Sequence, residues 1–299
     1  MKKSTAIRYC ASDRAFFTIT GVVLTLLILL VSYPILYVLS ASFSSAKAVT
    51  SGRVLLWPVD FSLEGYLAVF RHPKIIPSFF NTVLYTVLGT IINVTTAMLC
   101  AYPLSRKDLK GRGLLTLIFT FTMFFSGGLI PTYIQVLHLG LIDTLWAMVL
   151  PGALSVYNML VMRTFIESNI PGEMLEAASI DGCSDTRFLM QIVLPLSKAV
   201  IAVVAMFSAV GHWNSYFNAM IYLNTASKYP LQIILREILI MNQVDLNMVM
   251  EFQQKEAMTN LADVLKYSLI VVATAPIIMV YPFIQKYFVK GVMIGSVKG

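Results

Sequence analysis

Charged residues are scarce in this sequence. Only 12% of its 299 residues are Asp, Glu, Lys or Arg, whereas 58% are hydrophobic and the mean hydropathy is +0.77. A soluble domain usually carries about 25% charged residues. The composition therefore argues against a water-soluble globule, excludes intrinsic disorder, and predicts a chain whose main solvent is lipid.

Residues for metal and covalent chemistry are also few and scattered. The three cysteines, Cys10, Cys100 and Cys183, lie far apart, and no CxxC or HExxH pattern occurs. The sequence also lacks a phosphate-binding GxxxxGKS/T loop and a GxSxG nucleophile elbow. We therefore expect no disulfide framework, no catalytic or metal site, and no cofactor bound by this chain.

Long apolar runs are what the sequence has in abundance. Six stretches without any charged residue are long enough to cross a bilayer, which takes about 20 residues of helix. Lipid cannot satisfy free backbone polar groups, so such continuous runs predict helices. The expected membrane helices cover 16–39, 79–102, 114–133, 145–165, 199–222 and 267–288. The predicted fold is an all-α polytopic integral membrane protein.

The basic residues predict the orientation of these helices. Lys and Arg cluster before the first helix, after the second and in the C-terminal tail, whereas the loop after the third has neither. Loops rich in Lys and Arg stay in the cytoplasm, so we expect six crossings with both termini cytoplasmic. The first apolar run is too long for a signal peptide and is expected to remain as a span. These loops account for the net charge of +7, and no nucleic-acid partner is expected.

The charge-free windows contain none of the acidic or basic groups that ion-coupled carriers place at mid-membrane. His212, near the middle of the fifth predicted helix, suits a hydrogen-bonded contact with a neighbouring helix better than a proton relay. A membrane enzyme would need a catalytic cluster that the sequence lacks. We therefore expect another chain to supply the energy for transport, and an ion-coupled secondary carrier is the alternative.

The predicted cytoplasmic segment 163–198 differs from the other loops. Pro171 suits a helix start and Gly182 suits its end, with acidic residues between them. The pattern predicts a short helix, a glycine turn and a second short helix. An ordinary loop helix lying on the membrane would prefer Lys and Arg on its polar face, whereas this one is acidic with a small alanine face. We therefore predict a docking element for a cytosolic partner.

One motif in this segment is specific: Glu176-Ala177-Ala178-x-x-Asp181-Gly182, followed by Ile192-x-Leu194-Pro195. It resembles the EAA loop of permease subunits of bacterial ATP-binding-cassette (ABC) importers, in the form typical of carbohydrate importers. The family often has a proline where Ala199 stands, which bears only on the local bend.

Shorter stretches agree with this resemblance. They are Asn81-Thr82, Ala101-Tyr102-Pro103-Leu104-Ser105-Arg106 and Trp213-Asn214-x-Tyr216-Phe217. The glycine-containing C-terminus is similar to that of the maltose-importer G-type permease. Phe125-Ser126-Gly127-Gly128-Leu129-Ile130-Pro131 is similar to a subgroup that imports oligosaccharides released from complex polysaccharides, in which the alginate importer is a candidate.

The resemblance implies the type I ABC importer permease fold. It divides the chain into an N-terminal helix and outer loop, 1–74, and a permease core, 75–299, with the EAA loop at 171–196. It implies a multi-pass protein of the bacterial cytoplasmic (inner) membrane that moves oligosaccharides by alternating access. The implied partners are a second homologous permease in a heterodimer, two copies of an ATPase that binds ATP and Mg²⁺, and an extracytoplasmic solute-binding protein.

The resemblance also implies roles for individual residues. Contacts with the ATPase are implied for Glu176, Ala177, Ala178, Asp181, Gly182, Leu194 and Pro195. The tail residues would either reach the ATPase or form a basic tail near anionic lipid; they are Gly291, Gly295, Lys298 and Gly299.

Sugars need aromatic faces and amide hydrogen bonds, which the predicted helices offer. The candidate cavity residues are Asn81, Tyr85, Gly127, Gly128, Trp213, Asn214, Tyr216 and Asn218. The alternative is an aromatic belt at the membrane interface together with polar contacts between helices. The segment 231–239 predicts a surface helix, which would either receive the solute-binding protein or pack on this chain's own outer face.

Overall fold

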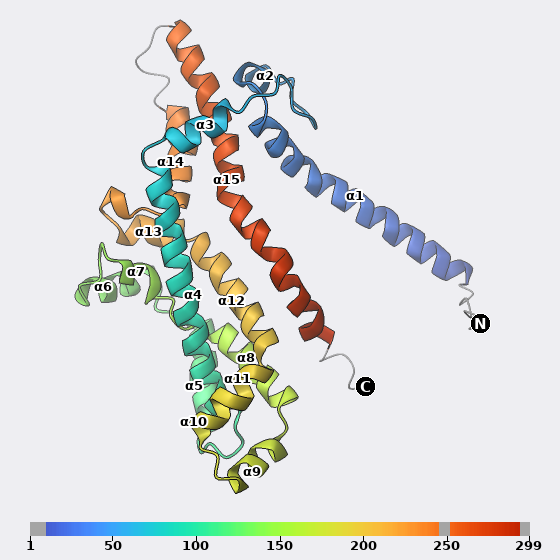
Figure 1. The fold of residues 1–299 in the computed structure, drawn as a ribbon, viewed down its shortest axis with the longest axis vertical. Helices are drawn as coiled ribbons and strands as arrows, with labels where there is room; N and C mark the ends of the chain where they lie inside the picture. Colours follow the sequence, from blue (N-terminus) through green and yellow to red (C-terminus); the bar gives the residue numbers. More distant parts are fainter. Residues whose placement is uncertain (1–9, 245–251, 294–299) are drawn as a thin grey trace. The chain divides into compact units, whose positions relative to one another are not determined.

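The computed structural model describes residues 10–244 and 252–293 (Figure 1). These residues form helices joined by loops, and the isolated bridge between Ser44 and Phe61 is their nearest approach to a strand. The all-α class predicted from the apolar runs is confirmed. The chain divides into two compact units, Met1–Arg71 with Ile238–Val272 and His72–Glu237 with Ala273–Gly299, and each is described by itself.

The first unit contains α1 (Ala11–Ser42), α2 (Ala46–Thr50), α3 (Glu64–Arg71) and the first part of α15 (Phe252–Met293). The apolar window of α1 is not buried by any described residue. The small core of this unit consists of Ala41, Ala48, Val49, Val54 and Val264. Gly65 lets α3 approach α15, because a Cβ there would lie 2.3 Å from the Ser268 hydroxyl. The end of α1, α2 and α15 are thus held together around this core.

The second unit is organised around α4 (Ile75–Ser105), which contacts both α8 (Val156–Asn169) and α12 (Lys198–Trp213). In Figure 1, α4 and α12 run next to each other. The other helices of this unit are α5 (Arg112–Phe124), α6 (Leu129–His138), α7 (Leu145–Val149), α9 (Gly172–Ile180), α10 (Asp185–Phe188), a π-helix η1 (Leu189–Val193), α11 (Leu194–Leu196), α13 (Tyr216–Tyr222) and a 3-10 turn η2 (Ala226–Lys228). Finally, α14 (Leu231–Val244) begins in this unit.

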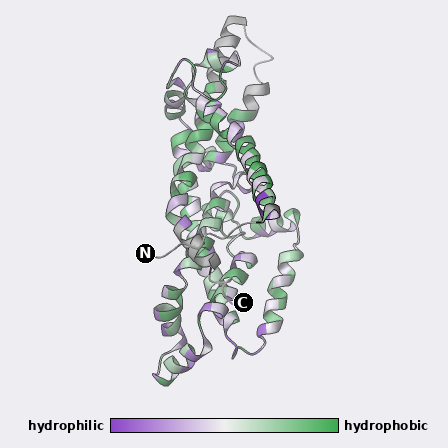
Figure 2. Ribbon diagram, turned by 90° about the vertical axis from the view of Figure 1, so that its right-hand side faces the viewer, coloured by the Kyte–Doolittle hydropathy of each residue, from purple (hydrophilic) through white to green (hydrophobic). Residues whose placement is uncertain are grey.

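Within residues 10–244 and 252–293, three helices are long and apolar enough to cross a membrane: Ser12–Ser42, Ile75–Ser105 and Val264–Phe283. Two bent pairs raise the number to five if each pair is one span. Hydrophobic residues dominate these long helices in Figure 2. The predicted spans 16–39 and 79–102 lie inside α1 and α4, and 267–288 lies inside α15. The number of crossings and the cytoplasmic position of both termini stay predictions.

The other predicted spans are not continuous helices, and this corrects the sequence-based expectation. The 114–133 span bends by 109° between α5 and α6, where Gly128 has φ +84° and ψ −175°, a conformation that only glycine adopts readily. The 145–165 span is broken at Pro151-Gly152 between α7 and α8. The 199–222 span is broken at Asn214-Ser215 between α12 and α13. Apolar composition does not show such breaks because a broken span is as hydrophobic as a straight one.

The break between α7 and α8 leaves backbone carbonyls without helical partners, and α4 supplies the donors. The Asn93 side-chain amide donates to the Gly152 carbonyl at 2.9 Å, and the Thr96 hydroxyl donates to the Ala153 carbonyl at 2.5 Å. Free backbone groups inside a membrane protein are tolerated where other protein groups satisfy them. The polar residues of α4 therefore make an irregular neighbouring segment possible.

Candidate functional site

The predicted docking segment, 171–196, has the predicted local form. α9 begins after Pro171, and Gly182 follows it with φ +72°, a left-handed conformation that glycine adopts without strain. The Asp181 amide closes α9 by donating to the Ala177 carbonyl. Ser184 then caps α10 by accepting from the Arg187 amide. The expected short helix, glycine turn and second short helix are confirmed.

One side of α9 is held by the core and the other is open. Leu175 and Ala178 pack against the core cluster of the second unit. On the open side, Glu176 and Ala177 are exposed, and Ile180 is 87% exposed. Apolar side chains that stand singly on a surface are common, so the relevant feature of α9 is the combination of an anchored side and an open side. The geometry of α9 therefore suits a docking helix that is fixed at its base.

The end of the docking segment is irregular in a specific way. Leu194 donates its amide to the Leu189 carbonyl five residues back, so residues 189–193 form a π-helix. The next residue, Pro195, has no amide hydrogen to donate. After Ser197 the chain continues into α12 at an angle of 79°. Short π-helices occur frequently at functional sites, and this one lies at the joint between the docking segment and α12.

Arg106 links the C-terminal end of α4 to α10. Its guanidinium forms ion pairs with Asp108 and with Asp185, the first residue of α10. It also donates to the Tyr102 hydroxyl at 3.3 Å, and that hydroxyl lies 3.4 Å from the Asp185 carbonyl oxygen. The Tyr102 ring in turn lies against the buried Phe188, with ring centroids 6.5 Å apart.

These contacts stabilise the charged forms of Arg106 and Asp108. The hydrogen bonds from Arg106 hold the pKa of Asp108 below its usual value. The hydrogen bond to Asp108 and the one to Asp185 raise the pKa of Arg106 above its already high value. A second set of ion pairs near this end joins Arg112 and Arg163 to Glu167 of α8. The C-terminal end of α4 is therefore bounded by charge pairs.

The N-terminal end of α4 holds the loop before α14 through neutral hydrogen bonds. Asn81 donates to the backbone carbonyls of Ser227 at 2.8 Å and Tyr229 at 3.1 Å. The buried Tyr85 donates its hydroxyl to the Lys228 carbonyl at 2.8 Å. Two of the predicted sugar-contact residues thus bind backbone carbonyls of this chain.

Asp143 fastens the other side of the same loop. It accepts from the backbone amides of Asn224 and Thr225, both at 3.0 Å, and pairs with the Lys228 ammonium at 2.7 Å. These donors, led by Lys228, hold the pKa of Asp143 well below its usual range. Asp143 itself has φ +58°, which is uncommon for a residue with a side chain. The loop at 223–230 is therefore fixed by side chains from two separate segments.

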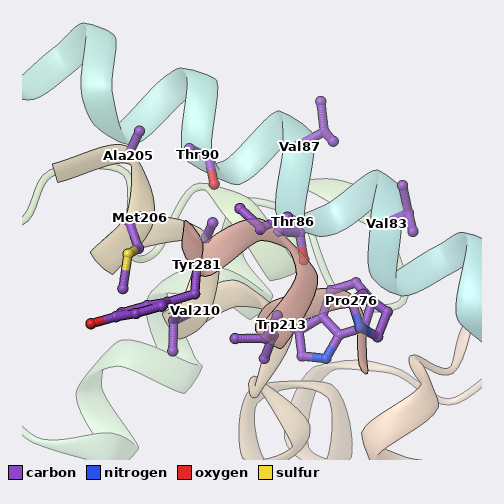
Figure 3. Close-up of a pocket in the computed structure, with 13 residues that line it drawn as sticks. Val83, Thr86, Val87, Thr90, Ala205, Met206, Val210, Trp213, Pro276 and Tyr281 are labelled. Atoms are coloured by element: carbon purple, nitrogen blue, oxygen red, sulfur yellow. The ribbon is translucent and has the colours of Figure 1, made fainter. Parts of the chain in front are cut away.

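A cavity of about 300 Å³ lies between α4, α12 and α15 within the second unit (Figure 3). Its walls are almost entirely apolar, apart from two threonines on α4. The lining residues are Val83, Thr86, Val87, Thr90, Ala205, Met206, Ala209, Val210, Trp213, Pro276, Ile277, Val280 and Tyr281. Trp213 is the member of the predicted sugar-contact set that lines it, and its indole N–H donates to the Ala273 carbonyl at 2.9 Å.

The remaining predicted cavity residues are not gathered there. Gly127 and Gly128 form the bend between α5 and α6. Asn214 donates to the Val210 carbonyl in the last turn of its own helix. Tyr216 and Asn218 are exposed on α13. The structure thus brings Asn81 and Tyr85 together and leaves the others at separate places, so their contact with sugar stays a prediction.

The structure describes only one of the predicted C-terminal tail residues, whereas it describes the whole predicted outer helix 231–239. Gly291 lies near the end of α15, whereas Gly295, Lys298 and Gly299 fall outside the described residues. The segment 231–239 forms the first part of α14, and Leu231, Ile233 and Ile234 are buried. Packing on this chain's own surface therefore accounts for that face of α14.

Sequence analysis did not find the polar group that joins three helices of the core. Asn93 of α4, Asn158 of α8 and Ser208 of α12 are all buried. The Ser208 hydroxyl donates to the Asn93 side-chain oxygen at 2.9 Å, and the Asn158 amide lies 3.4 Å from both. Their one sequence signal is an amide or hydroxyl inside an apolar run. Arg106 was quoted for its motif and its charge, without a partner.

Comparison with known proteins extends these observations. No protein-family model matches the chain. It is 42% identical over 269 residues to the polygalacturonan/rhamnogalacturonan transport system permease protein YtcP of Bacillus subtilis (strain 168), covering 89% of this chain and 92% of that protein.

Similar solved structures include two from alginate transporters. One is a chain from a bacterial ABC transporter involved in the import of the acidic polysaccharide alginate, with a TM-score of 0.84 and 34% identity over 95% of this chain and 100% of that chain. The other is from a bacterial alginate ABC transporter in complex with an alginate pentasaccharide-bound periplasmic protein. It has a TM-score of 0.53 and 13% identity over 91% of this chain and 95% of that chain, and shows the fold alone.

Proposed function

Because the chain belongs to the permease proteins of bacterial ABC sugar importers, we propose that it pairs with a second homologous permease to form an oligosaccharide pathway. The pair lies in the bacterial cytoplasmic (inner) membrane. Two copies of an ATPase, which bind ATP and Mg²⁺, drive it, and an extracytoplasmic solute-binding protein delivers the sugar. The family membership leaves the ion-coupled carrier without support.

The observation that carries this proposal is the exposed side of α9. Glu176, Ala177 and Ile180 face away from the core, while Leu175 and Ala178 hold the helix to it. A small side chain such as that of Ala177 lets a partner surface approach the helix backbone closely. The ATPase therefore docks on this side of α9, and closure of the ATPase pair on ATP moves the docking segment. Alternating access of the sugar pathway follows from that movement.

The substrate class that we propose is oligosaccharides released from acidic polysaccharides. This rests on the substrates of two similar proteins, polygalacturonan/rhamnogalacturonan and alginate. The test is uptake by the complete complex in vesicles, comparing galacturonate oligomers, alginate oligomers and neutral glucose oligomers of equal length. Faster uptake of either acidic series supports the class, and preference for the neutral series contradicts it.

Docking on α9 is tested with Gly182→Asp. A bulky anion at this turn should hold the ATPase off, at a cost of about 2 kcal/mol, which is about thirtyfold in affinity. We expect ATP-driven uptake to be lost while the protein still reaches the membrane. The measurements are uptake in vesicles and copurification of the ATPase in mild detergent.

The matched control is Gly140→Asp. Gly140 has φ +66° and, like Gly182, has no other atom within 4 Å of an added Cβ. Both substitutions therefore impose the same backbone strain, of about 1–2 kcal/mol, but only Gly182 lies in the docking segment. Normal uptake and ATPase binding by Gly182→Asp would contradict docking on α9. Equal loss in both variants would assign the effect to backbone strain.

A further inference from the structure

We propose that Arg106 and Asp185 form a clamp that transmits movement of the docking segment to α4. The inference rests on the function proposed above and adds a positioning residue to it. Arg106 follows the last residue of α4, and Asp185 is the first residue of α10. The clamp therefore joins two elements that lie 79 residues apart in the chain.

The first part of the clamp is the charge pair. Arg106 reaches Asp185 through one guanidinium nitrogen and Asp108 through the others. The arginine side chain is 18% exposed, whereas the Asp185 side chain is 70% exposed. The guanidinium is a planar group with a rigid fork of donors, and a mostly buried one keeps a fixed orientation. An exposed carboxylate can leave it at little cost. The ion pair therefore has a fixed orientation on the Arg106 side and can break and re-form on the Asp185 side.

The second part of the clamp is the ring contact beneath the charge pair. Tyr102 lies one helical turn before Arg106, and the guanidinium carbon is 6.0 Å from its ring centroid. The same ring lies against Phe188, which is buried at the end of α10. Both ends of α10 are thus tied to the last turn of α4, one by charge and one by aromatic packing. A displacement of α10 therefore moves α4 with it.

The clamp at the C-terminal end of α4 is connected through the helix to the loop held by its N-terminal end. α4 has 31 residues, which is about 45 Å of helix. At its N-terminal end, Asn81 and Tyr85 hold the backbone of the loop at 227–229. Rigid secondary elements are among the structures that carry coupling between distant sites, and α4 is such an element with contacts at both ends. Arg106 is thus placed to pass movement of α10 to the loop before α14.

Arg112 provides the matched control. It is a nearby arginine of the same charge, but it pairs with Glu167 of α8 at 3.0 Å and not with the docking segment. Arg163 of α8 also pairs with Glu167, at 3.1 Å, so that carboxylate keeps a partner when Arg112 is removed. Loss of Arg112 removes a cation near the same end of α4 and leaves the clamp in place.

The experiment uses the full complex in lipid vesicles, with both permeases, the ATPase and the solute-binding protein. Arg106→Ala, Arg106→Lys, Asp185→Ala, the double alanine variant and Arg112→Ala are compared. The readout is sugar molecules imported per ATP hydrolysed, together with the amount of ATPase that copurifies. A purely structural role would lower the amount of assembled complex and leave that ratio unchanged.

We expect Arg106→Ala to lower the ratio about fivefold or more, the range of a typical coupling energy between sites, with ATP hydrolysis continuing. Asp185→Ala should act similarly, and the double variant should be no worse than either single one, because both remove one interaction. Arg106→Lys should recover part of the ratio and Arg112→Ala should keep it. If Arg106→Ala does not assemble, Arg106→Lys and Asp185→Ala carry the test.

An unchanged ratio in Arg106→Ala and Asp185→Ala overturns the clamp, as does additive loss in the double variant or an equal loss in Arg112→Ala. The proposed function fails separately, if the unmodified complex imports sugar without ATP or does not import it at all. The two failures are therefore distinguishable in one set of vesicles.

Discussion

The two ends of α4 hold their neighbours by different chemistry. At the N-terminal end, Asn81 and Tyr85 donate neutral hydrogen bonds to backbone carbonyls, and the Thr82 hydroxyl accepts from the Leu231 amide at 2.8 Å. At the C-terminal end, Arg106 pairs with the exposed carboxylates of Asp108 and Asp185. The contacts at the first end are neutral and directed at the main chain, and the one between Thr82 and Leu231 is buried. The contacts at the second end are charged, and their carboxylates are exposed.

The two ends therefore differ in how easily their contacts break: the hydrogen bonds at the N-terminal end are fixed contacts, and the ion pair at the C-terminal end can break and re-form. A buried hydrogen bond to a carbonyl is costly to leave unmade, by about 1–3 kcal/mol. An exposed ion pair is worth only about 0–1 kcal/mol and can break and re-form. We therefore expect substitutions at the N-terminal end to lower stability and substitutions at the C-terminal end to lower transport coupling. The middle of α4 must stay intact for either end to act on the other.

The largest effect is expected at Gly89, midway along α4, where the His212 imidazole lies against the helix. An added Cβ would be 2.4 Å from His212 Nε2. Gly89→Ala should therefore force α4 and α12 apart and destabilise the protein by about 1–3 kcal/mol. The measurement is thermal unfolding in detergent, together with copurification of the partner subunits.

Gly211→Ala is the control for Gly89→Ala, because Gly211 lies in the last turn of α12 and an added Cβ there meets open space. It should be neutral or slightly stabilising, since alanine favours helix over glycine. Adding His212→Ala to Gly89→Ala should restore part of the lost stability. If both glycine variants unfolded at the same temperature, close packing of α4 on α12 at Gly89 would not contribute to stability.

A pair of tyrosines tests the two ends directly. Tyr85→Phe leaves the Lys228 carbonyl without its donor and should cost about 1 kcal/mol of unfolding free energy. The ratio of sugar to ATP should stay unchanged, because Asn81 still fastens this end of α4 to the loop. Tyr102→Phe keeps the ring on Phe188 but loses the hydroxyl contacts with Arg106 and Asp185. It should lower the ratio and barely change stability. Thermal unfolding and vesicle transport measure both variants.

The comparison would fail if the two tyrosine variants exchanged effects, with Tyr85→Phe uncoupling transport and Tyr102→Phe unfolding the protein. It would also fail if both variants changed stability alone, because the contacts at the C-terminal end would then be fixed as well.

The smallest effect concerns pH and the loop that Asp143 fastens. Its folded-state pKa is lowered by Lys228 and Thr225, so its contribution is present above the unfolded pKa of about 3.9 and is lost as pH falls below that value. Hydrogen exchange at the Asn224 and Thr225 amides, corrected for intrinsic rates, should therefore speed up as pH falls below about 3.9. Asp143→Asn should remove this pH dependence, and a wild-type profile without it would contradict the role of the carboxylate.

Much of the fold follows from local patterns. Apolar runs located α1, α4 and the membrane part of α15, and the proline, acid and glycine signals located α9 and its turn. The breaks at Pro151-Gly152 and Asn214-Ser215 were missed, because their surroundings are as apolar as an unbroken helix. Asn81 and Tyr85 were predicted to contact a sugar. That prediction left out their partners in the fold, which for Asn81 include a backbone carbonyl 146 residues away.

The sequence by itself determined the solvent of this protein, its helical class and the local helix–turn–helix form of the segment 171–196, because hydropathy, glycine conformation and helix-start chemistry act over a few neighbouring residues. Only the tertiary structure decided which polar side chains pair with one another. Arg106 with Asp185, Asn93 with Ser208 and Tyr85 with Lys228 are partners across long stretches of chain. Hydrogen bonds form between groups that the packing of helices brings within about 3 Å, and distance along the chain does not specify that packing.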